Sequence, residues 1–149
     1  MKRFVLLLTV WVCLIFICGC SSWTPVVDSL PKYDSKVYYT SGGFQDFTDY
    51  AKFSYSSVNI QELEKSEYFV PVTEADVTEI LQYLENFENW VTIIGEELEN
   101  YDFEKTIISD EDYFYIDTKY TDEEHKFWNY TIYYFDVDAQ ILYYFHNNL

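Results

Sequence analysis

The chain opens with an apolar run that is set apart from everything after it. Lys2 and Arg3 precede fourteen consecutive residues without a charge, from Phe4 to Ile17. A short basic head followed by an apolar stretch of this length is typical of a secretory signal peptide. A membrane-spanning helix needs about 20 apolar residues, so we expect a cleaved signal here rather than a retained span.

The strongest helical pattern lies in the middle of the chain, over residues 73–94. Apolar residues recur there at steps of three and four, which places them on one face of a helix: Val77, Ile80, Leu81, Leu84, Phe87, Val91 and Ile94. Thr73 and Asp76, three residues apart, are a variant of the capping box that begins helices. The pattern predicts an amphipathic helix that packs through Leu81 and Leu84.

Most of the remaining pattern has a period of two, which is the spacing of β-strands. Residues 37–58 are rich in tyrosine and phenylalanine, with a turn at Gly42-Gly43 and an alternating pattern over 47–56, which predicts extended structure. Three aromatic or β-branched runs follow at 113–120, 127–135 and 141–146. Polar segments of loop length separate these runs, which predicts a three-stranded antiparallel meander.

The last two runs also predict their own pairing. A four-residue loop at 137–140 places Tyr134 opposite Tyr143 and Ile132 opposite Phe145. Both faces of these strands are aromatic, so the pattern leaves open which face is the core. The predicted fold class is α+β, with one long amphipathic helix packed on an antiparallel β-sheet that ends in the three-stranded meander.

The apolar run ends in a short motif, Ile17-Cys18-Gly19-Cys20. It resembles the lipobox of bacterial lipoproteins, which has an aliphatic residue, two small residues and then a cysteine. The resemblance implies that Cys20 is the lipid attachment site and that residues 1–19 are removed as a lipoprotein signal peptide. Two acyl chains hold a protein stably at a membrane. We therefore expect a lipidated tether over 20–36 and a single globular α+β domain over 37–149.

Three further segments resemble small uncharacterised lipoproteins of Gram-positive, clostridia-type bacteria: residues 43–52, 112–116 and 142–149. This resemblance implies an extracytoplasmic protein, held by the Cys20 lipid on the outer face of the cytoplasmic membrane. It implies no particular activity.

Composition narrows the partners and the chemistry. The chain has 26 acidic and 9 basic residues, a net charge of −17, which speaks against a nucleic-acid partner. An aromatic content of 21% speaks against disorder. Loss of residues 1–19 would leave a net charge of −19. Two of the three cysteines would leave with that segment and lipid would take the third, so no thiol remains for a disulfide or a metal site.

Groups that could carry catalysis are few. His125 lies in an acidic loop, where a solvated surface histidine is expected, and His146 ends a strand; the other roles of a catalytic triad have no candidates. Asp136-Val137-Asp138 resembles the start of a calcium loop but lacks the glycine and the closing glutamate, so a hairpin turn explains it better. The acidic clusters at 110–112 and 122–124 are expected to be solvated surface. We predict no catalytic residues, no metal site and no cofactor.

The tyrosine content bears on function. Sixteen tyrosines exceed what we expect a small core to seat with satisfied hydroxyls, so some should lie on the surface, where tyrosine favours binding faces. A tyrosine-rich, half-exposed strand is the alternative. The favoured function is a non-catalytic lipoprotein that binds an envelope protein, peptide or glycan. The alternatives are a surface immunity or inhibitor protein against a basic toxin or enzyme, and a small carboxylate-dependent hydrolase.

Overall fold

The computed structural model describes residues 25–43, 46–94 and 101–149. In chain order its elements are α2 (Pro25–Asp28), β1 (Ser35–Gly42), β2 (Phe47–Ser54), α3 (Ile60–Lys65), β3 (Val70–Pro71), α4 (Glu74–Ile94), a 3-10 turn (Lys105–Ile107), β4 (Tyr113–Thr118), β5 (Asn129–Asp136) and β6 (Ile141–Asn148). Within the described ranges, none of the helices combines the length and the hydropathy that a membrane span requires.

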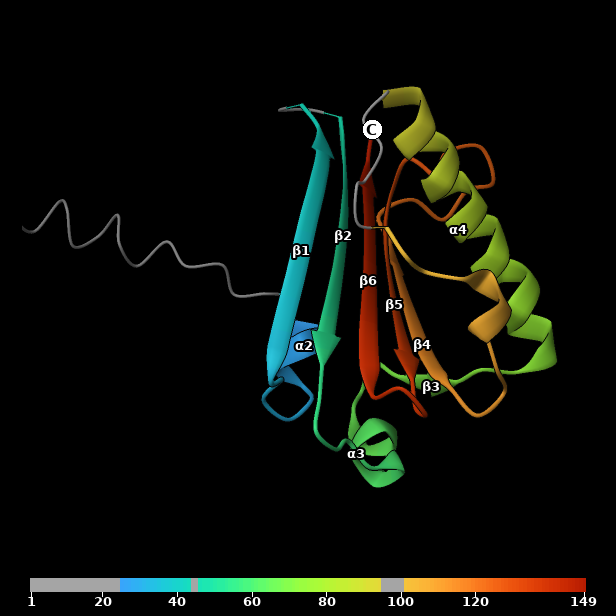
Figure 1. Ribbon diagram of the computed structural model, residues 1–149. Coiled ribbons are helices and arrows are strands. Elements are labelled where there is room, and N and C mark those ends of the chain that lie inside the picture. Colours follow the sequence, from blue (N-terminus) through green and yellow to red (C-terminus); the bar gives the residue numbers. More distant parts are fainter. Residues whose placement is uncertain (1–24, 44–45, 95–100) are drawn as a thin grey trace, which may run out of the picture.

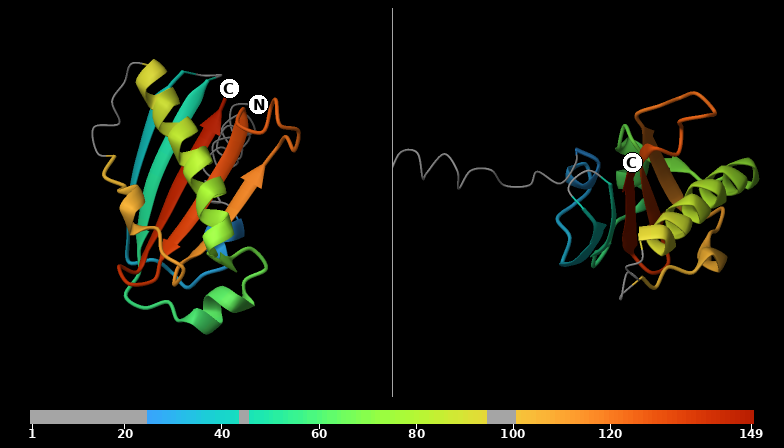
Figure 2. Two further views of the ribbon diagram at one scale, coloured as in Figure 1. Left: turned by 90° about the vertical axis from the view of Figure 1, so that its right-hand side faces the viewer. Right: turned by 90° about the horizontal axis from the view of Figure 1, so that it is seen from above.

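The six strands form one antiparallel sheet in the order β1-β2-β6-β5-β4-β3 (Figure 1). The long helix α4 lies on one face of this sheet, and the short helices α2 and α3 pack against the other. Figure 2 shows the helices on opposite sides of the sheet and α4 running obliquely across the strands. The fold is therefore α+β, as the sequence pattern predicts.

The last three strands form the predicted meander. β4, β5 and β6 are neighbours, and each pair is antiparallel. The register pairs Tyr134 with Tyr143 and Ile132 with Phe145, so the predicted pairing is confirmed. It holds because a loop of fixed length determines which residues of two hairpin strands meet.

The turn that joins β5 to β6 involves Asp136 and Asp138, the two aspartates that resemble the start of a calcium loop. Asp136 Oδ1 accepts the backbone N–H of Ala139 at 2.8 Å, and Gln140 takes a left-handed φ of 56°. Asparagine and aspartate side chains close turns in this way by accepting a nearby backbone N–H. The hairpin turn predicted for Asp136-Val137-Asp138 is confirmed.

The first two strands form a hairpin that joins the sheet beside β6. Gly42 ends β1 with a φ of 112°, a conformation that costs glycine little and other residues much. A Cβ at this position would collide with the backbone carbonyl of Asp46. The predicted turn at Gly42-Gly43 is therefore confirmed, although residues 44–45 lie outside the described part of the chain.

Helix α4 begins where the capping pattern predicts. The backbone N–H of Thr73 donates to Asp76 Oδ2 at 2.9 Å, which is one half of a capping box. Leu84 is fully buried, as predicted, but Leu81 is only partly buried. Tyr83 is 3% exposed and takes the place expected for Leu81, because its ring reaches the β4–β5 loop from the flank of the helix.

Both faces of the sheet are buried, so the sheet has one hydrophobic core on each face. The face toward α4 packs around Leu84, Phe87 and Phe145. The opposite face packs around Phe53, Phe135 and residues of the two short helices. Each strand in the middle of the sheet therefore contributes aromatic residues to two separate cores, which is why its two faces look alike in sequence.

The predicted tether over 20–36 is wrong for its second half. Residues 25–28 form α2, and Val26, Val27 and Leu30 are buried against the sheet at 4%, 3% and 7% exposure. The prolines and serines of this stretch suggested a linker, but three apolar side chains are enough to dock it. The described domain therefore begins at residue 25 or earlier, and residues 20–24 lie outside the described part.

The expectation that some tyrosines lie on the surface is confirmed for Tyr38, but most of the sixteen are buried. Nine of the sixteen are buried, and among all sixteen only Tyr38 is classed as exposed. Two cores offer more room than one, and the acidic residues of the chain supply partners for the hydroxyls. Tyr134, for example, donates to the carboxylate of Asp112, which is itself 4% exposed.

Candidate functional site

A line of polar residues crosses the face of the sheet opposite α4. Asp49 of β2 pairs in register with His146 of β6, His146 pairs with Thr131 of β5, and Thr131 pairs with Asp117 of β4. Side chains directly opposite one another on neighbouring strands share a face. These four residues, which we call the polar row, therefore lie side by side on one face although they are up to 97 positions apart in sequence.

Asp49 is the unusual member of the polar row. It is 7% exposed, and its Oδ1 is buried without a hydrogen-bond partner. Thr48 Oγ1, Tyr55 Oη and Asn147 Oδ1 are the other buried side-chain oxygens in this state among the described residues, and none of them is a carboxylate oxygen. A buried polar group without a partner costs about 1–3 kcal/mol, and more when it is charged. Asp49 therefore favours the approach of a hydrogen-bond donor.

Tyr38, on the edge strand of the sheet, is a neighbour of Asp49. This residue belongs to β1, is 40% exposed and hydrogen-bonds to the side chain of Asp49. Partial burial is the main reason that the pKa of Tyr38 rises to about 12, and the charge of Asp49 and the hydrogen bond to it add to the rise. The hydroxyl of Tyr38 thus stays protonated at neutral pH and donates to the carboxylate.

Rings of neighbouring residues lie on the same face of the sheet as this carboxylate. Phe47 lies two residues before Asp49 on the same strand face, and its ring centre is 5.4 Å from that of His146. Tyr144, two residues before His146, has a raised pKa, chiefly through burial and further through electrostatic interactions with Tyr133, Asp49 and Tyr38. The faces of such rings attract cations. Carboxylate and rings together suit a cationic group such as a lysine ammonium or an arginine guanidinium.

His146 is held in one orientation. Its Nδ1 lies 2.9 Å from the carbonyl oxygen of Tyr130 and 2.9 Å from Thr131 Oγ1. A carbonyl oxygen only accepts, so we assign the proton to Nδ1. Burial lowers the pKa of His146 below its usual 6.5, against the opposing effects of the Tyr130 hydrogen bond and the charges of Asp49 and Asp117. The ring is therefore neutral at pH 7, with its lone pair on Nε2.

This tautomer determines whether His146 can act as a general base toward the Thr131 hydroxyl. A general base must accept the proton of its nucleophile on a nitrogen that carries a lone pair. The nitrogen that faces Thr131 already carries a proton, so the arrangement does not activate the threonine hydroxyl. It leaves Nε2 of His146 as an acceptor, which would again favour a ligand that donates hydrogen bonds.

A groove on the other side of the molecule is a second candidate. It has a volume of about 480 Å³ and lies between α4 and the β4–β5 loop, lined by Gln82, Glu85, Asn86, Asn89, Glu123, Lys126 and Phe127. Its polar groups have partners: Asn86 Oδ1 accepts the hydroxyl of Tyr130 at 3.0 Å, and Lys126 Nζ lies 2.8 Å from Glu123 Oε2. None of its lining residues has a buried polar atom without a partner, in contrast to Asp49, so we interpret the groove as solvated surface.

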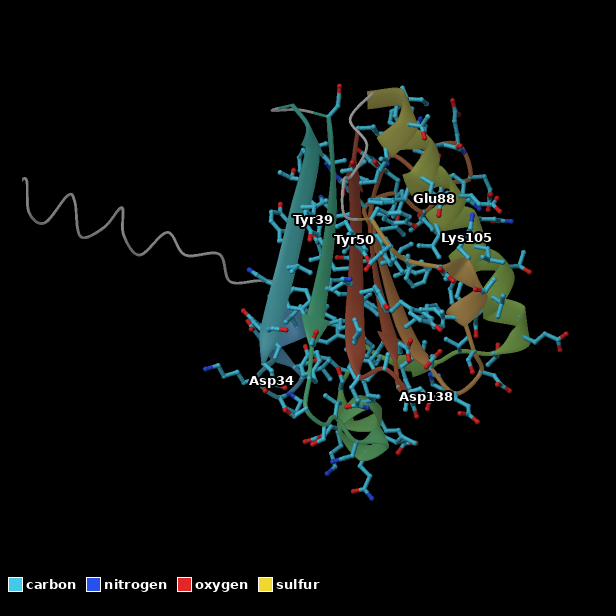
Figure 3. The ribbon with its side chains drawn as sticks, viewed as in Figure 1. Asp34, Tyr39, Tyr50, Glu88, Lys105 and Asp138 are labelled. Atoms are coloured by element: carbon cyan, nitrogen blue, oxygen red, sulfur yellow. The ribbon has the colours of Figure 1, made fainter. Side chains whose placement is uncertain are left out.

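Other carboxylates pair with tyrosine hydroxyls. Tyr101 donates to Glu88 Oε1 at 2.9 Å while Lys105 Nζ lies 2.8 Å from Glu88 Oε2, and Figure 3 shows Glu88 and Lys105 facing each other. Tyr50, which Figure 3 places beside Tyr39, donates to Asp102 at 2.8 Å. Burial is the largest cause of the raised pKa values of Tyr50 and Tyr101, followed by these carboxylate bonds. These pairs are structural, because every partner is already bound.

The residues singled out in the sequence occupy different places. Cys20, the predicted lipid attachment site, lies outside the described residues. His125 Nδ1 is 2.5 Å from Asp122 Oδ1 at the surface, as expected for a solvated loop. Asp112, in contrast, is buried rather than solvated. No group of three or more histidine, cysteine or acidic side chains in the described part could hold a metal ion.

Sequence reasoning missed Asp49 and its cross-strand pairing with His146. One signal was present: Asp49 interrupts an alternating phase that is otherwise Phe47, Ala51, Phe53 and Tyr55. A charged residue in the inward phase of a strand is a candidate for function, since burial of an unpaired charge is costly.

Comparison with models of known protein families, with characterised proteins and with solved structures gives no significant match.

Proposed function

We propose that the protein is a lipoprotein anchored through Cys20 on the outer face of the cytoplasmic membrane, and that its domain binds a basic protein or peptide of the envelope without catalysis. The signal-like segment and the lipobox resemblance support the anchor. The surroundings of Asp49 support the partner.

The observation that carries the proposal is the unpartnered, buried Oδ1 of Asp49, on the same face of the sheet as neighbouring aromatic rings. An arginine or lysine side chain supplies the missing donor together with the opposite charge. Charge-assisted hydrogen bonds contribute about 1.5–3 kcal/mol, and the rings add cation–π attraction. A neutral glycan hydroxyl offers a donor without the charge, so this site favours a basic partner over a glycan.

Access to the carboxylate runs past Tyr38. This side chain is 40% exposed, and exposed side chains change rotamer within nanoseconds. An incoming cation replaces the hydrogen bond from the Tyr38 hydroxyl with a charged one, so the exchange favours the bound state. Tyr38 then lies against the ligand as one wall of the site.

The net charge of −17 supports the same partner class. A strongly acidic domain attracts a basic partner over a distance of about 8–10 Å at moderate salt and raises the association rate. This attraction and the Asp49 site equally suit the alternative of an immunity or inhibitor protein. In that case the basic partner is a toxin or enzyme, and binding abolishes its activity.

A peptide titration tests the proposal. The full-length protein in neutral detergent micelles is titrated with a peptide as long as β1 in which arginine and threonine alternate. The matched control peptide carries citrulline, a neutral isostere, at every arginine position. We expect saturable binding of the arginine peptide, weakened by salt, and at least tenfold weaker binding of the citrulline peptide.

Two variants separate the site from the overall charge. Asp49→Asn removes the carboxylate, whereas Asp138→Asn removes one charge from the exposed β5–β6 loop at the other end of the sheet (Figure 3). We expect Asp49→Asn to weaken binding about tenfold or more and Asp138→Asn to change it less than twofold. Equal effects of the two variants would show that the peptide responds to net charge alone, and the proposal would be wrong.

A further inference from the structure

The two edges of the sheet are built differently. On one side the sheet ends in β3, which has two residues, and one of them is Pro71, which has no backbone N–H. On the other side it ends in β1, which has eight residues and no proline. Short strands and prolines are the usual means by which proteins block pairing at a sheet edge. One edge is therefore blocked and the other is not.

β1 has a neighbouring strand on one side only among the described strands (Figure 1). In an antiparallel pair, alternate residues turn their N–H and C=O groups away from the partner strand. Val37 and Tyr38, which lie on opposite faces of β1, are 42% and 40% exposed, so the described part of the chain leaves both faces partly open at this edge. β1 therefore presents a template to which an extended chain can add.

The register places this template beside Asp49. Thr40 of β1 is the direct cross-strand partner of Asp49 in β2. A strand added outside β1 lies two strand spacings, about 9.5 Å, from Asp49. The side chain of a residue opposite Thr40 would run across the face of the sheet toward the carboxylate. Lysine and arginine are long enough to cover that gap, whereas short side chains are not.

The net charge of the chain favours a basic partner over a second copy of the chain at the outer edge of β1. A second copy of the chain would bring its own net charge of −17 to the interface, and like charges repel. A basic segment of another protein brings the opposite charge. It also brings the long cationic side chain that the position of Asp49 requires.

Building on the proposed function, we infer that the basic partner binds by β-augmentation. An extended segment of the partner adds to the outer edge of β1 as a seventh strand. Backbone hydrogen bonds hold the segment, and one arginine or lysine, placed opposite Thr40, reaches across β1 to Asp49. Main-chain pairing supplies affinity in this mode, and a site for an alternate side chain supplies selectivity.

Two N-methylated isomers of the arginine–threonine peptide test this inference with the full-length protein. One isomer is methylated at the backbone nitrogens of the arginines and the other at those of the threonines. Each methylated set blocks one edge of an extended peptide, and only one edge faces β1. We expect one isomer to bind at least tenfold more weakly than the unmethylated peptide and the other to bind within about threefold of it.

Hydrogen exchange supplies an independent readout. We expect backbone amides of β1 to exchange more slowly when the unmethylated peptide is bound, with no comparable change in β3. Equal binding of the two isomers, equal loss by both, or unchanged exchange in β1 would overturn the strand addition. If the unmethylated peptide binds and depends on Asp49 while any of these results is found, the proposed function stands and only β-augmentation fails. If the unmethylated peptide does not bind, both fail.

Discussion

Replacement of Leu84 by alanine tests the packing of α4 on the sheet. Leu84 is 0% exposed and belongs to the same apolar cluster as Ile80, Phe87 and Phe145. The change removes three carbon atoms, which costs about 2.4 kcal/mol of transfer free energy at about 0.8 kcal/mol each. The aromatic rings around the site are rigid and relax little, so a cavity cost is added. We expect the free energy of unfolding to fall by about 3–4 kcal/mol.

Leu81→Ala is the matched control. It makes the same substitution in the same helix, with the same change in helix propensity, at a position that is only partly buried. We expect a loss of about 1 kcal/mol or less there, because fewer contacts are removed and no closed cavity forms. The difference between the two variants therefore measures burial alone.

The assay is urea unfolding of the full-length chain in mild detergent, followed by far-ultraviolet circular dichroism with the slope compared between variants. A loss below about 0.5 kcal/mol for Leu84→Ala, the range of surface substitutions, would refute the packing of α4 described above. Equal losses for Leu81→Ala and Leu84→Ala would mean that the helix is rotated about its axis relative to the structure.

Four further predictions concern single residues. Cys20→Ser should abolish incorporation of labelled acyl chains and retention with membranes, and labelling at the wild-type level would contradict the lipid anchor. Because burial lowers the pKa of His146 in the folded state, the unfolded chain binds protons more readily, and stability should fall as pH drops below about 6.5. That loss should be smaller in His146→Gln, and an identical pH dependence in the two proteins would argue against a buried neutral ring. Tyr134→Phe removes a hydrogen bond from the buried carboxylate of Asp112 and should cost about 1–3 kcal/mol in urea unfolding, whereas a cost below about 0.5 kcal/mol would show that water replaces the hydroxyl. Asp49→Asn should leave the free protein as stable as wild type or slightly more stable, since it removes a buried charge whose Oδ1 has no hydrogen-bond partner, and a loss above about 2 kcal/mol would assign Asp49 to the fold.

The local pattern of the sequence was enough to predict the long helix and the strand pairing within the meander. The steps of three and four around Leu84 identify α4, and the four-residue loop fixes Tyr134 opposite Tyr143, because both depend only on residues close in the chain. The pairing of β2 with β6 could not be read in the same way, since about 90 residues separate the two strands. The polar row depends on that pairing, so Asp49 and His146 could not be brought together from sequence.

Two differences between expectation and structure have the same cause. The tether was placed too far along the chain, and more tyrosines than Tyr38 were expected to be exposed, because the sequence does not show that both faces of the sheet are covered. Val26 and Val27 look like isolated apolar residues until a second core receives them. Tyr133 and Tyr134 are both buried although they are consecutive in one strand, which is impossible in a sheet with one solvated face.

A double-mutant cycle between Asp49 and one arginine shows whether the peptide's cation binds at the Asp49 carboxylate. The binding free energies of wild-type protein and Asp49→Asn are measured by calorimetry with the arginine–threonine peptide and with the same peptide carrying citrulline at its central arginine. If that arginine donates to the Asp49 carboxylate, the two changes are not additive, and we predict a coupling energy of about 1.5–3 kcal/mol. A coupling energy indistinguishable from zero at every arginine position tested would show that no arginine contacts Asp49 and would contradict the account.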